Sequence, residues 1–207
     1  MVYNKIMERE AYVVIFSELM DKVNQYLEER WNANVIVTGT EGAGLSRFYV
    51  YAAYQLIFQH HDKVKSLPSF DLVLNSRNEY HKYCASTKEF TLLAVDEAND
   101  ISLKHRVIRL IEGDSSKLLG WRGVSILFAA EGLPSMHRYA KVDPYTYILP
   151  VWTLDELRAL NSLLRDDLQL PEDALSARYY RNYIYRVLRM VPDKSDYRAK
   201  YHWDFLS

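Results

Sequence analysis

The alternation of hydrophobic and polar positions predicts helices at both ends of the chain, with short strands between them. Over residues 6–31, hydrophobic side chains recur every three to four residues without glycine or proline, which is typical of a helix with one buried face. The same spacing predicts helices over residues 46–61 and 154–166. Residues 171–190 are expected to form a last helical section, rich in tyrosine and arginine.

Short apolar runs bounded by polar residues predict the strands. The run over residues 90–95 is nearly continuous, so we expect a strand that is buried on both faces. Residues 107–112 are instead predicted to form a short helix. The other predicted strands are Val35–Thr38, Phe70–Leu74, Gly123–Ala130 and Tyr147–Leu149.

Strands that alternate with helical segments predict an α/β fold, with a mostly parallel sheet flanked by helices. A chain of 207 residues is long enough for one substantial domain with a small appendage. Because a helical section begins near Pro150, we expect a core over residues 1–150 and a helical lid section over residues 151–207.

The first predicted strand runs into a glycine-rich loop that approximates a phosphate-binding loop. The pattern of such loops is G-x-x-x-x-G-K-[ST], and this chain has Gly39, four residues, Gly44, Leu45 and Ser46. A strand, this loop and a helix in that order predict a P-loop NTPase-like fold. The candidate nucleotide-binding residues are Gly39, Thr40, Gly42, Ala43, Gly44, Leu45, Ser46 and Arg47.

One residue of the loop departs from the pattern in a way that bears on chemistry. The lysine that would reach the terminal phosphates is replaced by Leu45, while Ser46 keeps the hydroxyl that binds Mg²⁺ in such loops. Arg47 lies two positions further on, roughly 200° round the helix, so it is not expected to replace the lysine. On its own, the loop leaves open whether it binds phosphate or is only a glycine-rich turn.

A second acidic motif follows the predicted strand over residues 90–95. Asp96 and Glu97 stand where an aspartate can hold Mg²⁺ and a glutamate can orient or deprotonate a water. The alternative is that the pair only ends a strand and caps the next helix. The order of the two motifs favours descent from nucleotide hydrolases.

Composition and charge restrict the expected binding partners and the expected compartment. The net charge of −1 gives no whole-chain electrostatic argument for nucleic acid or an anionic membrane. No run of about 18 apolar residues is present, and no signal-peptide pattern is visible, so we expect a soluble, intracellular chain. The single Cys84 fits a reducing compartment.

With both motifs placed, the chain resembles the P-loop NTPase domain of Crinkler effectors and retrotransposon hot spot proteins. The segment 37–48 is similar to that family's TGTPGIGKSRF, with Glu41 for the proline and Leu45 for the lysine. Residues 9–12 resemble a short RE-x-Y helix start. Residues 150–157 match the P-x-W-[ST]-x-[DE]-E-L box, in which Thr153 and Glu156 form a capping box.

The resemblance implies functional roles and also shows where residues are lost. It implies binding of ATP and Mg²⁺, a lid arginine at Arg186 that reaches the nucleotide, and DNA-associated or host-nuclear action after secretion if the chain is a Crinkler-type effector. Near Arg186 the family's glycines and proline are absent, and residues 129–132 lack the polar residues found there. The arginines and tyrosines over residues 178–189 can pair phosphate contacts with base stacking, but their near-balanced charge favours a solvated lid or interaction helix.

These observations favour a degenerate P-loop NTPase-fold module that acts through macromolecular contacts, with a protein partner that the sequence does not identify. If nucleotide binds, Ser46 and Asp96 are the predicted metal ligands, and Glu97 and Arg186 the predicted catalytic residues. One rival is an active ATPase whose missing lysine comes from elsewhere. A second rival is a pure interaction module that binds no nucleotide.

Overall fold

The computed structural model describes residues 7–76, 79–84, 86–113, 118, 120–130, 145–164, 166–177 and 179. The chain divides into two compact units, Met1–Pro150 and Val151–Ser207. In the described part of the chain, no helix is both long and apolar enough to cross a membrane.

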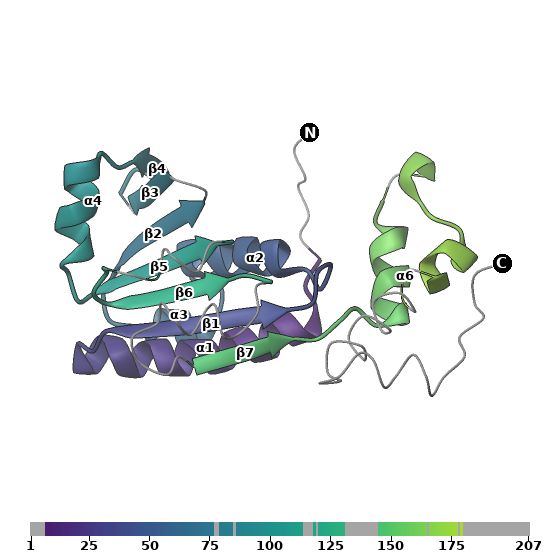
Figure 1. Ribbon diagram of the computed structural model, residues 1–207, viewed down its shortest axis with the longest axis horizontal. Coiled ribbons are helices and arrows are strands. Elements are labelled where there is room, and N and C mark those ends of the chain that lie inside the picture. The colour runs from purple at the N-terminus through teal and green to yellow at the C-terminus, as the bar shows by residue number, and fades with distance from the viewer. Residues whose placement is uncertain are drawn as a thin grey trace, which may run out of the picture. The chain divides into compact units, whose positions relative to one another are not determined.

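The first unit is built on a seven-stranded sheet with the order β4-β3-β2-β5-β6-β1-β7 (Figure 1). The pairs β2–β5, β5–β6, β6–β1 and β1–β7 are parallel, and β3 and β4 add an antiparallel hairpin beside β2. The strands are β1 Ala33–Gly39, β2 Asp71–Ser76, β3 Glu79–Cys84, β4 Glu89–Leu92, β5 Val107–Glu112, β6 Val124–Phe128 and β7 Tyr145–Leu149. The predicted α/β fold with a mostly parallel sheet is confirmed.

Most side chains of the central strands are apolar because both faces of the sheet are covered. In β1, Val35 and Val37 belong to the main core, whereas Ile36 packs on the opposite face with Leu127 of β6. Parallel strands buried on both faces read as continuous hydrophobic runs, which explains why β1 and β6 were predictable.

Three helices contribute to the main core on one face of the sheet, and a fourth packs on the other face. The helices of the first unit are α1 Glu10–Glu29, α2 Leu45–Phe58, α3 Asp62–Lys65 and α4 Val95–Ser102. Tyr12 of α1 stacks on Phe48 of α2 with 4.8 Å between ring centroids, and both are fully buried in the main core. Figure 1 shows α1 running alongside β1 and β7. Ile101 of α4 packs with Val73 and Val107 on the opposite face.

Two of the predicted elements are wrong, and both errors come from short apolar runs. Residues 90–95 form the exposed edge strand β4 and the start of α4, so they are not a doubly buried strand. Residues 107–112 are the buried strand β5, which replaces the predicted helix. A run of four to six apolar residues has the same pattern in a central strand, an edge strand or a buried helix, and only its neighbours in the fold decide between them.

The strand β5 contains a buried arginine, which interrupts its apolar run. Arg109 is 1% exposed, and its guanidinium lies 4.5 Å from the centroid of the Trp121 ring. Burial disfavours the charged form and lowers the pKa of Arg109 to about 9. The flat guanidinium stacks on the indole, which lets a charged residue occupy the middle of a central strand.

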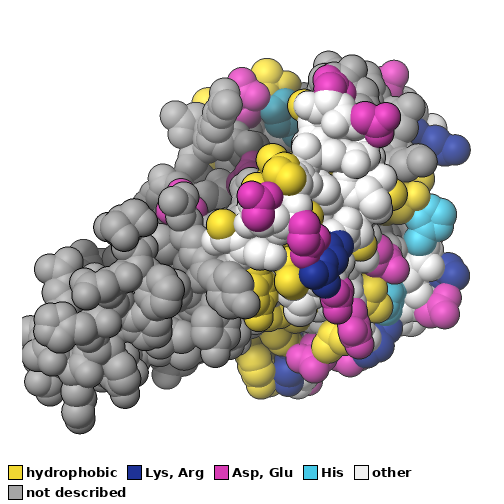
Figure 2. All heavy atoms as spheres, turned by 90° about the vertical axis from the view of Figure 1, so that its right-hand side faces the viewer, with side chains coloured by type: hydrophobic (Ala, Val, Ile, Leu, Met, Phe, Trp, Pro, Cys, Tyr) yellow, Lys and Arg dark blue, Asp and Glu magenta, His cyan; other side chains and the backbone are white. Residues whose placement is uncertain are grey.

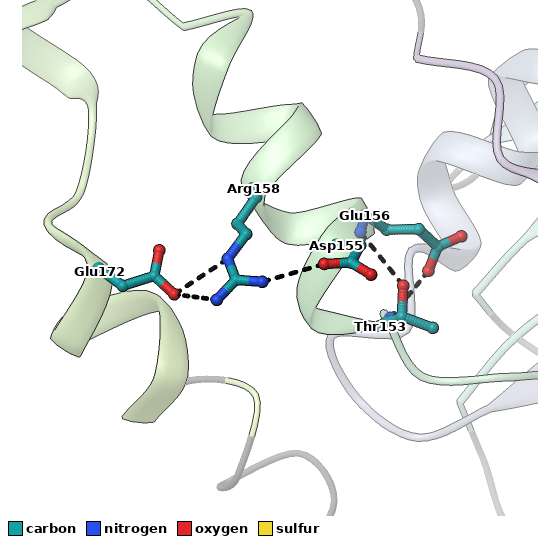
Figure 3. A network of polar contacts seen from close by, with 5 residues as sticks. All are labelled: Thr153, Asp155, Glu156, Arg158 and Glu172. Atoms are coloured by element: carbon teal, nitrogen blue, oxygen red, sulfur yellow. Dashed lines mark hydrogen bonds and ion pairs between the residues drawn. The ribbon is translucent and has the colours of Figure 1, made fainter.

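The described part of the second unit begins with the predicted capping box. Thr153 accepts a hydrogen bond from the Glu156 backbone at 3.1 Å, and Glu156 accepts one from the Thr153 backbone at 2.8 Å, at the start of α6 Leu154–Ser162 (Figure 3). Arg158 bridges Asp155 and Glu172, which ties α6 to the helical residues 172–177. A 3-10 turn, η2 Asp166–Leu168, lies between them in sequence.

Replacing one leucine by alanine in each of the two wrongly predicted runs tests which strand is buried and which is exposed. Leu110→Ala in β5 is expected to lower the free energy of unfolding by about 2–5 kcal/mol, because it leaves a cavity in the main core. Leu92→Ala in β4, where the side chain is 57% exposed, should change it by about 0.5 kcal/mol or less. Urea denaturation of both variants measures the difference, and equal losses would contradict the assigned positions.

Candidate functional site

The candidate site lies where β1 ends, at the loop that leads into α2. Gly42 and Gly44 have φ angles of 82° and 100°, in the left-handed region that favours glycine. Gly44 is also the residue that caps α2, so the helix begins directly at Leu45. The glycines of the motif therefore set a sharp strand-to-helix turn.

Gly39 is required for a different reason, namely close packing against the last strand. A Cβ atom at Gly39 would lie 2.9 Å from the carbonyl oxygen of Leu149 and 3.3 Å from the Cβ of Ala43. Gly39 pairs directly with Leu149 in the parallel register of β1 and β7. The first glycine of the motif thus lets the loop fold back against the end of β7.

The loop presents hydrogen-bond donors that suit an anion. The first N–H to enter the helical hydrogen-bond pattern of α2 is that of Phe48, which donates to Gly44, so the N–H groups of Leu45, Ser46 and Arg47 have no acceptor within the helix. The Thr40 hydroxyl is buried and finds no hydrogen-bond partner among the described residues. These donors and the positive end of the helix dipole fit a phosphate group.

The side chains of the loop give no positive charge to such an anion. Leu45, in the position of the lysine, is half-buried and packs against the main core. Glu41 and Arg47 are both exposed. A carboxylate at Glu41 places negative charge beside a phosphate site, where like charges oppose binding.

The opposite side of the loop is held by two residues at the start of the chain. Arg9 is 1% exposed and donates from Nη1 to the carbonyl of Ala43 at 2.8 Å and from Nη2 to the carbonyl of Pro150 at 3.2 Å. The Tyr12 hydroxyl donates to the carbonyl of Gly44 at 3.0 Å. The guanidinium of Arg9 also lies 5.3 Å from the centroid of the Tyr12 ring. We call Arg9 and Tyr12 the loop clamp.

The loop clamp does not follow from the residue pattern alone. An arginine just before an amphipathic helix reads as a solvated residue, and only the resemblance drew attention to residues 9–12. A usable signal was the placement of Arg9 and Tyr12 three positions apart, which puts them on one face of the chain as it enters a helix.

The predicted acidic pair is not brought to the loop. Asp96 and Glu97 lie on α4, directly after β4, and five strand spacings of about 4.8 Å separate β4 from β1, or roughly 24 Å. Glu97 accepts a hydrogen bond from the Ala94 backbone at 2.9 Å, so it caps α4. The structure thus does not assemble Ser46 with Asp96, and it supports the capping alternative for Glu97. The predicted lid residue Arg186 lies outside the described residues.

A different carboxylate, Glu112, lies at the end of a strand near α2. Glu112 ends β5 and pairs in register with Phe128 of β6, which in turn pairs with Val37 of β1, so it lies two strands from the loop strand. It shares the main-core face of the sheet with α2, where burial and, to a lesser extent, the Glu112 charge raise the pKa of Tyr49. A carboxylate at the carboxyl end of a parallel strand, facing the helix that carries Ser46, fits Mg²⁺ held by an acid and a hydroxyl.

Charged side chains of both signs lie on the face of the molecule that Figure 2 shows. Acidic, basic and hydrophobic side chains are interspersed over its coloured area, and no continuous basic patch is visible among the described residues on this face.

The comparisons with known proteins add a likeness in fold alone. No protein family model and no curated protein matches the chain. The chain is similar to one in the structure of Drosophila ORC bound to DNA, with 13% identity and a TM-score of 0.48 over 87% of this chain and 52% of that one. A chain in the E. coli MS115-1 HORMA:CdnC:Trip13 complex shows 15% identity and a TM-score of 0.37 over 80% of this chain and 68% of that one. This chain thus spans about half the length of the first, and neither likeness bears on function.

Removal of the loop clamp should loosen the loop. Arg9→Met keeps the length of the side chain but leaves the carbonyls of Ala43 and Pro150 without their donor, so a loss of about 1–3 kcal/mol in the free energy of unfolding is expected. Amide hydrogen exchange over residues 40–48 should become faster. Arg30→Met, at an exposed position, is the matched control and should change neither quantity. Unchanged exchange in Arg9→Met would remove the clamp from the account of the loop.

Proposed function

We propose that this chain is a degenerate P-loop NTPase-fold module, which binds nucleotide weakly or not at all, does not hydrolyse it efficiently, and acts through macromolecular contacts. We include in this proposal a relationship to the Crinkler and retrotransposon hot spot proteins. The observation that carries the proposal of weak or absent nucleotide binding is Leu45. Its side chain packs against the main core at the position where a phosphate-binding lysine belongs.

The arginines nearest the loop in sequence or by contact do not replace the lysine. Arg9 donates to the carbonyl oxygen of Ala43 in the loop and is almost fully buried. Arg47 is exposed on α2, and Glu41 adds a negative charge. This arrangement disfavours the rival in which an active ATPase recruits a cation from elsewhere in the described part of the chain.

The remaining donors support residual affinity for polyphosphate. If nucleotide binds, the N–H groups after Gly44 and the Thr40 hydroxyl would hold phosphate, and Ser46 and Glu112 would hold Mg²⁺. The metal, when bound, would neutralise charge on the phosphate oxygens. We assign Glu112 to this role in place of Asp96 because of its position beside α2.

Two features support the relationship to the named family. The clamp residues Arg9 and Tyr12 fall in the segment that resembles RE-x-Y, and they contact the loop that resembles the family's phosphate loop. The box over residues 150–157 contains the Thr153–Glu156 capping pair and the buried Trp152. A lid role for residues 151–207 and a protein partner are parts of the same proposal.

Calorimetry with Mg·ATP tests the loop directly. The unaltered chain is expected to bind with a dissociation constant of about 1 mM or weaker, and Leu45→Lys should strengthen binding by about tenfold or more, because it restores a cation at the terminal phosphates. Leu45→Met is the matched control, since it changes the side chain without adding charge. Micromolar binding and steady turnover by the unaltered chain would defeat the proposal.

The metal assignment is tested in the Leu45→Lys background. Glu112→Gln should weaken the Mg²⁺-dependent part of ATP binding by about tenfold, whereas Asp96→Asn should leave it unchanged, because Asp96 lies on α4. Calorimetry with ATP in the presence and absence of Mg²⁺ separates the two. The reverse result would restore the assignment of the metal to Asp96.

A further inference from the structure

Among the described residues, β4 is the terminal strand at one edge of the sheet, and some of its backbone groups point away from β3. The Leu93 N–H donates to the Tyr80 carbonyl at 2.9 Å, which makes these two residues a hydrogen-bonded pair of the antiparallel ladder. Such pairs alternate along a ladder, so residues 89, 91 and 93 face β3. The N–H and C=O groups of Phe90 and Leu92 therefore face outward, at the edge of the sheet.

A pocket of about 530 Å³ lies beside this edge, and its mixed lining includes the polar residues Glu79, Asn99 and Ser102. Its wall includes Tyr80 and Trp121, whose rings stack with centroids 5.5 Å apart, together with Leu92, Leu93 and Val95. Leu92 is 57% exposed and Val95 is 78% exposed. Large exposed apolar side chains beside a hollow with an aromatic wall are typical of a site that receives an apolar side chain.

The segment that forms β3, β4 and the start of α4 is acidic, although the whole chain is nearly neutral. Residues 79–100 contain five acidic side chains and two lysines, against a net charge of −1 for the complete sequence. One of the lysines, Lys82, is ion-paired with Asp71 at 2.8 Å, which leaves the acidic groups in excess. The acidic residues are Glu79, Glu89, Asp96, Glu97 and Asp100.

We propose that the edge of β4 takes up an extended, basic segment of a partner protein as an additional strand. The backbone of the partner pairs with the outward groups of Phe90 and Leu92. One of its apolar side chains enters the pocket beside Trp121, and its lysine or arginine side chains face the acidic residues around it. Main-chain pairing gives affinity in this mode of recognition, and the pocket and the charges give specificity.

This inference deepens the proposed function, because it names a surface for macromolecular contact. It does not depend on whether the phosphate loop binds nucleotide, since the two regions lie on opposite sides of β2, β5 and β6 in the sheet order. A failure of either proposal is therefore distinguishable: nucleotide binding reports on the loop, and peptide binding reports on β4.

Fluorescence anisotropy with labelled peptides tests the surface on the full chain. A peptide of about six residues that alternates lysine and valine is the probe, because six residues match the usual length of a strand. It is expected to bind with a dissociation constant of about 10–100 μM, at least tenfold tighter than a glutamate–valine or a lysine–serine peptide of the same length. No binding of the lysine–valine peptide, or equal binding of all three, would overturn the proposal.

Three variants distinguish pairing of the peptide as an added strand from non-specific electrostatic binding of the peptide. Leu92→Pro removes an outward N–H without removing a ladder hydrogen bond, and should weaken binding by at least tenfold. Glu79→Gln combined with Asp96→Asn should weaken it by about threefold to tenfold and reduce its salt dependence. Val14→Ser, at a 49% exposed position on α1, is the control and should bind as the unaltered chain does.

Amide exchange on the unaltered chain gives a readout that no substitution can confound. The N–H groups of Phe90 and Leu92 should exchange fast in the free protein and become protected when the lysine–valine peptide is present. Sedimentation equilibrium without peptide covers the other occupant: concentration-dependent dimers that Leu92→Pro abolishes would replace the partner segment with a second copy of this chain. Protection of these two amides with a monomeric free chain supports the proposal.

Discussion

In the loop after β1, the backbone carbonyl groups and the backbone N–H groups face different neighbours. The loop clamp, Arg9 and Tyr12, occupies carbonyl oxygens of Ala43 and Gly44, and this leaves N–H groups at the start of α2 directed to the other side. A peptide group cannot offer both ends to the same neighbour, so fixing the acceptors orients the donors. The glycines permit the turn, but the clamp holds it.

The clamp acts together with two other contacts to hold the shape of this loop. The hydrogen bonds from Arg9, the close contact of Gly39 with Leu149 and the stacking of Tyr12 on Phe48 are all internal to the fold. None of them needs a ligand. Leu45 even adds contacts with the main core. The backbone of the loop is therefore held independently of any charge that its side chains carry.

The fold was predictable where local pattern and tertiary environment agree. The long amphipathic helices, the continuous runs of β1 and β6, and the capping box of Thr153 and Glu156 follow from spacing alone. The positions of β4 and β5 did not follow, because a short apolar run does not carry information about its neighbours in the sheet. That single ambiguity is why Asp96 and Glu97 were expected after a buried strand, whereas they follow the edge strand β4. Contacts between distant residues, such as Arg9 with Pro150, leave no local trace in the sequence.

The contacts of Arg9 have a consequence for the order in which the fold can form. They join residues that are 34 and 141 positions apart in the chain. The loop next to β1 is therefore completed only after β7 and Pro150 have been synthesised. One edge of β1 pairs with β7, and one of the two hydrogen-bond acceptors of Arg9 is the carbonyl of Pro150. Contacts of such large sequence separation slow folding. During synthesis, β1 would keep one open edge until β7 arrives, which makes the nascent chain vulnerable to mispairing at β1.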